Sequence, residues 1–211
     1  MHCALSCCTR EANGKEAREG SETMTVVLKT HRFTVDDYHR LGEVGILSDD
    51  DRVELLAGAI VEMSPIGPLH AGTVNRLTTL FSSRLGSRTI VGIQNPLQLR
   101  PEDSEPQPDV ALLRQRDDFY TRAHPEADDV YLVIEVADTS VEKDREVKFP
   151  IYASAGIPEA WLLNISEESL EVHRHPTPDG YQEVHILHRG DAIAPQAFPD
   201  LILTVADLLG P

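Results

Sequence analysis

Hydrophobic positions along the chain change their spacing several times, and each spacing predicts a different element. From His70 to Leu85 apolar residues recur at three- and four-residue steps, which predicts an amphipathic helix ending at Gly86. Thr34 is a helix-start residue followed by helical spacing, so a shorter helix is expected there. Residues 52–63 read as two short strands joined at Gly58. The first third therefore predicts a helix, a hairpin and a second helix.

Apolar runs predict strands in the rest of the chain. Three of them, expected to form the core of the sheet, cover residues 89–99, 109–113 and 130–137. Three more, in a half expected to be β-rich, cover residues 161–165, 169–174 and 181–187. The helix at 70–85 is expected to cover one face of this sheet.

Residues 144–155 have helical spacing with Pro150 inside it. Proline lacks a backbone N–H and clashes with the preceding turn of a helix. Either two short helices meet here, with Pro150 in the first turn of the second, or one helix kinks. The break is predicted just after Lys148.

Length and composition predict one soluble domain. The chain has 211 residues, 41% of them hydrophobic, which suits a single domain over residues 24–211. Residues 1–23 lack periodicity and are expected to be a disordered leader. All three cysteines lie within the first eight residues, so a disulfide framework is excluded. No membrane-spanning run or secretion signal is recognisable, and a cytoplasmic protein is expected.

Charge limits the function classes. The formal net charge is −16, and the leader accounts for only one of these negative charges. Affinity for nucleic acid usually comes from Lys and Arg that release counterions, so the net charge argues against a broadly basic binding surface. Any grip on phosphates has to be local or metal-mediated.

Two carboxylates occupy informative positions. Asp109 opens one predicted strand and Glu135 lies near the end of another, so neighbouring strands could bring both to one divalent cation. Asp109 could instead be a turn residue. Glu135 stands in an apolar run, where burial is expensive without a partner, and a structural ion pair is its alternative interpretation.

Phosphodiester hydrolysis needs a cation that polarises the phosphoryl group and acidifies a water, with a positive group that offsets charge in the transition state. Lys148 follows Glu135 by 13 residues, where a helix could return its ammonium to the carboxylates. The alternative is a surface pair with Asp144, four residues earlier. Glu54 could add a further acid or face solvent in its hairpin. His70 could start its helix, contact a phosphate or carry a proton.

Ordered motifs across residues 31–207 resemble the Uma family of restriction-endonuclease-like proteins, in the PD-(D/E)XK nuclease superfamily. The motifs are Glu54 in Val-Glu-Leu-Leu-Ala-Gly58, Ser64-Pro65 with His70, Ser-Glu-Pro-Gln-Pro-Asp109, Ile-Glu135-Val-Ala-Asp-Thr-Ser, and Asp144 with Lys148, Tyr152, Gly156 and Trp161.

The resemblance implies an α/β fold with a restriction-endonuclease-like core, a central mixed sheet flanked by helices. It implies Asp109 and Glu135 as ligands of Mg²⁺ or Mn²⁺, Glu54 as an additional acid, and Lys148 as the catalytic lysine. The superfamily's usual lysine lies two residues after the Glu, where this chain has Ala137. DNA as substrate follows from the resemblance alone, and a homodimer follows by analogy with enzymes that cut two strands.

Two classes of function remain open at this point. The first is a metal-dependent endonuclease, with His70 as a substrate contact. The second is a non-catalytic protein-binding module that keeps the fold and recruits a partner through its acidic exterior. A hydrolase of a small phosphorylated molecule lies between them. Tyr152 and Trp161 are interpreted as core or interface aromatics without a site role.

Overall fold

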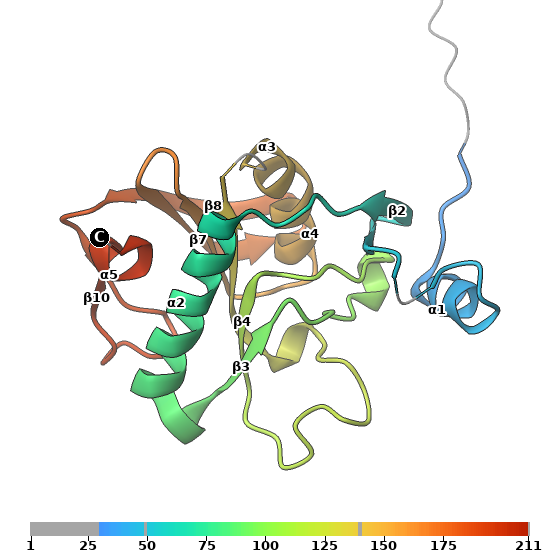
Figure 1. Ribbon diagram of the computed structural model, residues 1–211, viewed down its shortest axis with the longest axis horizontal. Helices are drawn as coiled ribbons and strands as arrows, with labels where there is room; N and C mark the ends of the chain where they lie inside the picture. The colour runs from blue at the N-terminus through green and yellow to red at the C-terminus, as the bar shows by residue number, and fades with distance from the viewer. Residues whose placement is uncertain (1–29, 49, 139–140, 211) are drawn as a thin grey trace, which may run out of the picture. The chain divides into compact units, whose positions relative to one another are not determined.

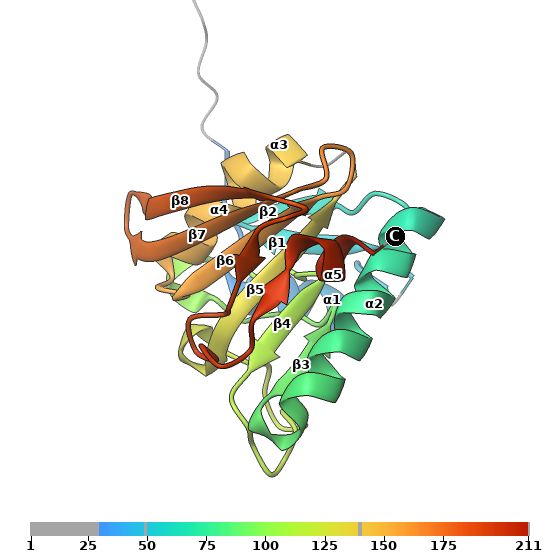
Figure 2. The same cartoon turned by 90° about the vertical axis from the view of Figure 1, so that its left-hand side faces the viewer.

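The computed structural model describes residues 30–48, 50–138 and 141–210. The predicted leader, residues 1–23, lies outside these ranges, and the described residues from Arg32 onward form one compact unit. At its centre is a six-stranded sheet (Figures 1 and 2). In spatial order its strands are β3 Ile90–Ile93, β4 Val110–Leu113, β5 Val130–Ala137, β6 Glu159–Asn164, β7 Ser169–Thr177 and β8 Gly180–His188.

The sheet is mixed, as expected. β5 and β6 pair in parallel, and all other neighbours in the sheet pair antiparallel. The prediction for residues 89–99 was wrong in two respects: the strand there spans only Ile90–Ile93, and it forms an edge. Gln94 ends it, with a φ of 51° that a continuing strand does not allow. β5, one of the three predicted core strands, is central together with β6, and this parallel pair connects the two antiparallel halves.

Each face of the sheet carries its own core. Helix α2, Pro68–Leu85, packs through Val74, Leu77 and Phe81 against one face, together with the short helix α5, Val205–Leu209. Figure 2 shows α2 and α5 on this side of the strands. The opposite face is covered by α4, Phe149–Ser154. A short pair of strands, β9 Ala192–Ile193 and β10 Leu203–Thr204, completes the β-rich C-terminal half.

The segment between β5 and β6 contains an irregular helix. α3, Val141–Lys143, leads into a π-helical turn, Asp144–Lys148, and α4 begins at Phe149. In the π turn the Phe149 N–H bonds to the Asp144 carbonyl, five residues back. Pro150 cannot donate a backbone hydrogen bond, so the regular α-helical pattern cannot pass this point. The break predicted after Lys148 is therefore a change of helix type without a gap, with Pro150 in the first turn of α4.

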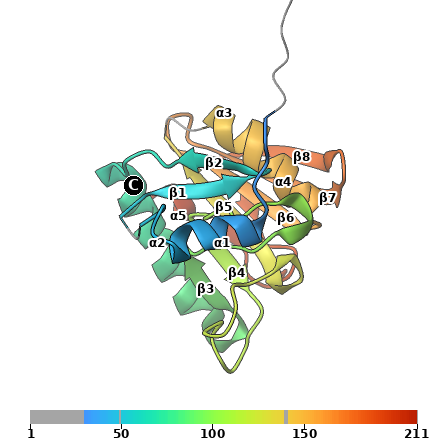
Figure 3. The ribbon, with the colours of Figure 1, turned by 90° about the vertical axis from the view of Figure 1, so that its right-hand side faces the viewer.

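The predicted first helix and hairpin are also present. α1 spans Val35–Glu43 with Thr34 as its N-cap, and β1, Val53–Leu56, pairs with β2, Ala59–Glu62 (Figure 3). Gly58 turns this hairpin at a φ of +77°, and a Cβ there would lie 2.6 Å from a side-chain carbon of Arg32.

Shorter elements complete the described chain. Its 3₁₀ turns are Gly86–Arg88, Arg100–Glu102 and Ala127–Asp129. A single bridge between Leu55 and Glu105 joins the hairpin to the segment that leads into β4. In the described ranges no helix combines the length and the apolar character that crossing a membrane requires.

Candidate active site

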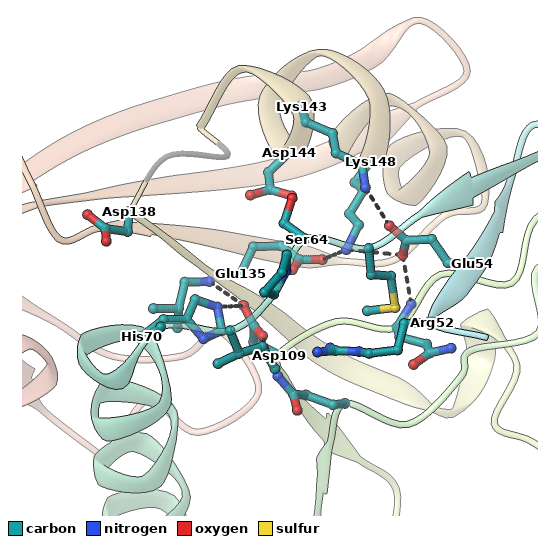
Figure 4. A pocket seen from close by; sticks show the side chains of 17 residues that line it. Arg52, Glu54, Ser64, His70, Asp109, Glu135, Asp138, Lys143, Asp144 and Lys148 are labelled. Atoms are coloured by element: carbon teal, nitrogen blue, oxygen red, sulfur yellow. Dashed lines mark hydrogen bonds and ion pairs between the residues drawn. The ribbon is translucent and has the colours of Figure 1, made fainter. Parts of the chain in front are cut away.

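Asp109 and Glu135 meet because of the register between two neighbouring strands. Val110 of β4 lies opposite Ile134 of β5 in an antiparallel pair, so the next position places Asp109 opposite Glu135. Directly opposite residues point to the same face of a sheet. The Val136 N–H donates to Asp109 Oδ2 at 2.9 Å, which ties the two strand ends together. The structure therefore brings the two acids to one place (Figure 4).

Asp109 is held on both carboxylate oxygens. Besides the Val136 bond, Oδ2 lies 3.0 Å from His70 Nε2, and Oδ1 accepts a bond from Gln94 Nε2 at 3.1 Å. Burial would raise the pKa of Asp109, but the hydrogen bond and charge of His70 outweigh burial and hold that pKa below its ordinary value. The same bond raises the pKa of His70 against the effect of burial. Asp109 is thus oriented and negatively charged.

Glu135 lies deeper in the protein. The residue is 2% exposed, and Oε1 accepts bonds from the Tyr152 hydroxyl at 2.6 Å and from Lys148 Nζ at 3.2 Å. Burial raises the pKa of Glu135 to about 8, although the charge of Lys148 opposes that increase. An additional positive charge beside Glu135 would favour its ionised form and so lower its pKa.

Lys148 lies between two acids at the end of the π turn. Its Nζ is 3.2 Å from Glu135 Oε1 and 3.2 Å from Glu54 Oε2, and the residue is 5% exposed. The surface-pair alternative with Asp144 therefore does not hold. Burial disfavours the charge of Lys148, but the two carboxylates outweigh burial and hold its pKa above the ordinary value.

Glu54 on β1 connects two lysines. It is 1% exposed, which excludes the solvent-facing alternative. Oε1 accepts a bond from Lys143 Nζ at 2.9 Å, and Oε2 accepts one from the Gln107 N–H at 3.2 Å in addition to its contact with Lys148. Glu54 therefore holds the ammonium of Lys148 from the side opposite Glu135.

These residues line one pocket of about 270 Å³, whose exposed rim residues open it to solvent. The pocket contains more negative than positive side chains. Its acidic side chains are Glu54, Asp109, Glu135, Asp138 and Asp144, and its basic ones are Arg52, His70, Lys143 and Lys148. An acidic lining of this kind attracts a cation.

The donor chemistry fits a hard, hydrated cation. Within residues 30–48, 50–138 and 141–210 no group of three or more His, Cys, Asp or Glu is arranged to hold a metal ion by itself, so a closed zinc-type site is not built here. Mg²⁺ commonly uses one or two carboxylates and keeps several waters. An octahedral Mg²⁺ with two carboxylate ligands keeps about four waters. These occupy roughly 120 Å³ in the liquid, and the pocket has room for them.

Comparison with known proteins identifies the family. A family model described as "Uma2: Putative restriction endonuclease" matches residues 35–206. The chain belongs to the Uma2 family. A crystal structure from Anabaena variabilis, described as a putative nuclease of DUF820, aligns with a TM-score of 0.67 at 16% identity, covering 84% of this chain and 97% of that one. This similarity confirms the expected nuclease fold. Among curated proteins no match was found.

In this Uma2 chain the five site residues predicted from the sequence all line this pocket: Glu54, His70, Asp109, Glu135 and Lys148. Tyr152, Lys143 and Gln94 were missed as contributors. The position of Tyr152 four residues after Lys148 gave one usable signal, because that spacing places both on one helix face. Lys143 and Gln94 gave none, since their contacts depend on β1 and on the turn after β3.

Proposed function

We propose that this Uma2 protein is a Mg²⁺- or Mn²⁺-dependent endonuclease that hydrolyses phosphodiester bonds in DNA. One observation carries the proposal: Asp109 and Glu135 converge from adjacent strands beside the buried ammonium of Lys148, in a pocket open to solvent. Membership of a family described as restriction endonucleases supports the reaction class. The ion, the substrate and the roles of the residues are parts of the proposal.

Asp109 and Glu135 would hold the cation. Oδ2 of Asp109 already accepts two bonds and Oδ1 only one, so Oδ1 has a free acceptor direction. Oε1 of Glu135 is shared by Tyr152 and Lys148, which leaves Oε2 as its ligand atom. The bound cation would polarise the phosphoryl group and lower the pKa of the attacking water. The predominance of acidic side chains in the pocket supports a bound cation.

The remaining residues orient these groups. Lys148, fixed between Glu54 and Glu135, would offset negative charge that develops on the phosphoryl oxygens. His70 uses Nε2 to hold Asp109, and its Nδ1 is buried without a hydrogen-bond partner in the described part of the chain. We therefore assign His70 the orientation of Asp109 in place of a direct substrate contact.

A homodimer is part of the proposal, because cutting both strands of a duplex suits two symmetric sites. β8 forms one edge of the six-stranded sheet, and Val184 and Ile186 on it are 49% and 61% exposed. An antiparallel pairing about a two-fold axis at His185 would set Val184 of one copy against Ile186 of the other. The apolar stripe formed by Val184 and Ile186 is thus self-complementary.

Asp109→Asn and Glu135→Gln test the function. The wild type should nick supercoiled plasmid DNA with Mg²⁺ or Mn²⁺, and each variant should lose at least about 100-fold in rate, because the cation contributes several kcal/mol to the transition state. Glu43→Gln, which removes an exposed carboxylate at the end of α1, is the matched control and should cut like the wild type. Circular dichroism checks that each variant folds.

Parallel assays separate the alternatives. Single-stranded DNA, RNA and bis(p-nitrophenyl) phosphate are offered under the same conditions. Cleavage of the small diester alone would replace the DNA assignment with a small-molecule hydrolase. A wild type that cuts none of these substrates with either ion would refute the enzyme and leave the non-catalytic binding module.

A further inference from the structure

Tyr152 makes a contact that the proposed reaction does not use. Its hydroxyl lies 2.6 Å from Glu135 Oε1, and the two residues are 0% and 2% exposed. An aromatic side chain that only fills the core does not need an acid as its hydrogen-bond partner. A buried tyrosine hydroxyl could equally be satisfied by a backbone carbonyl, as Tyr181 is by Ile157 at 2.8 Å. The partner of Tyr152 is instead one of the two central acids of the pocket.

The bond from Tyr152 acts together with the bond from Lys148. The two residues lie four positions apart, with Lys148 ending the π turn and Tyr152 within α4, and both donate to the same oxygen. Two donors at Oε1 use its acceptor directions and oppose rotation of the carboxylate. The hydroxyl keeps its proton, because burial and then the charge of Glu135 raise the pKa of Tyr152 well above its ordinary value.

We propose that Tyr152 is a positioning residue for the cation site, one that holds Oε1 of Glu135 so that Oε2 is presented to the ion. Outer-shell partners of this kind fix the orientation of a ligating group. The inference rests on the proposed function only through the cation, since Tyr152 itself touches neither ion nor substrate.

Tyr152→Phe tests the role, because it removes one hydroxyl and keeps the ring. Loss of an outer-shell partner typically weakens metal affinity by about 10- to 100-fold. Calorimetry should therefore show Mn²⁺ bound at least about tenfold more weakly. The Mg²⁺ concentration for half-maximal nicking should rise by a similar factor, while the rate at saturating Mg²⁺ returns toward that of the wild type.

Tyr181→Phe is the matched control. It removes another hydrogen-bonded tyrosine hydroxyl, on β8, that does not contact Glu135. A purely structural effect would appear in both variants, whereas the proposed role predicts unchanged Mn²⁺ affinity for Tyr181→Phe. Equal affinities in Tyr152→Phe and the wild type, or equal losses in both variants, would overturn the inference.

A second measurement uses the wild-type sequence and does not depend on how well the variant folds. The chain has five tyrosines, and with 3-fluorotyrosine at all of them the ¹⁹F resonance of Tyr152 should shift when Mg²⁺ binds, while that of Tyr181 stays. No shift at Tyr152 would count against the inference. If the wild type binds Mn²⁺ but cuts nothing, the proposed function alone is refuted. If it binds no divalent ion, both the proposed function and the role of Tyr152 are refuted.

Discussion

At the residue scale, two lysines share Glu54 but differ in burial. Lys148 is buried between two carboxylates, while the Lys143 side chain is 34% exposed at the pocket rim. Removing one partner of a buried ion pair strands the other charge in a medium that solvates it poorly, whereas an exposed pair is screened by water. The two lysines therefore contribute differently to stability.

Lys148→Met should lower the free energy of unfolding by about 3 kcal/mol in buffer with chelator. Lys143→Met, the matched control, should lower it by less than about 1 kcal/mol. Urea unfolding followed by circular dichroism measures both. Equal losses in the two variants would mean that Lys148 is not the buried counter-ion of this site.

At the scale of elements, the sequence predicts the strands of the site better than its helix. Alternation and apolar runs predict where β4 begins and where β5 ends, and antiparallel pairing then brings Asp109 to Glu135. Lys148 reaches the carboxylates because a π turn precedes Pro150. Hydrophobic periodicity predicts a break at this point but does not predict the π turn. Tyr152 has the spacing of any core aromatic. Its bond to Glu135 arises from tertiary packing, which no local pattern contains.

The outer side of the same helical segment predicts a pH dependence of stability. Arg145 of the π turn and His173 of β7 both bond to Glu171, which is 6% exposed. The hydrogen bond from His173, helped by Arg145 and opposed by burial, lowers the pKa of Glu171 from 4.5 to about 2. A carboxylate whose pKa is lower in the folded protein stabilises the fold fully at pH values above its pKa in the unfolded chain. That contribution should be lost as the pH falls from about 4.5 to about 2.

Glu171→Gln should flatten this part of the stability curve, with the largest loss relative to wild type above pH 4.5 and convergence near pH 2. Thermal unfolding across the pH series measures it. Glu43→Gln, which removes an exposed carboxylate at the end of α1, serves as the control and should leave the slope in place. A wild-type slope that survives Glu171→Gln would assign the acid sensitivity to other groups.

At the scale of the whole molecule, charge and sheet edge limit how DNA could be engaged. With 35 acidic and 19 basic residues, the surface repels a polyanion over long range. Contact must therefore concentrate where cations gather, at the pocket rim with Arg52 and Lys143 and at the proposed ion. A dimer would contact one duplex at two pockets, whereas a single protomer would contact it at one.

Ile186→Lys tests the dimer, because it places a charge in the stripe that would pair across β8. Sedimentation should show a dimer for the wild type and a monomer for the variant. The variant should keep nicking single strands and lose double-strand breaks. Ile202→Lys changes another exposed isoleucine, 73% exposed and outside the six-stranded sheet, and should remain dimeric. A monomeric wild type at tens of micromolar would leave β8 as an unused edge, and cutting of two strands would then require two separate encounters with the duplex.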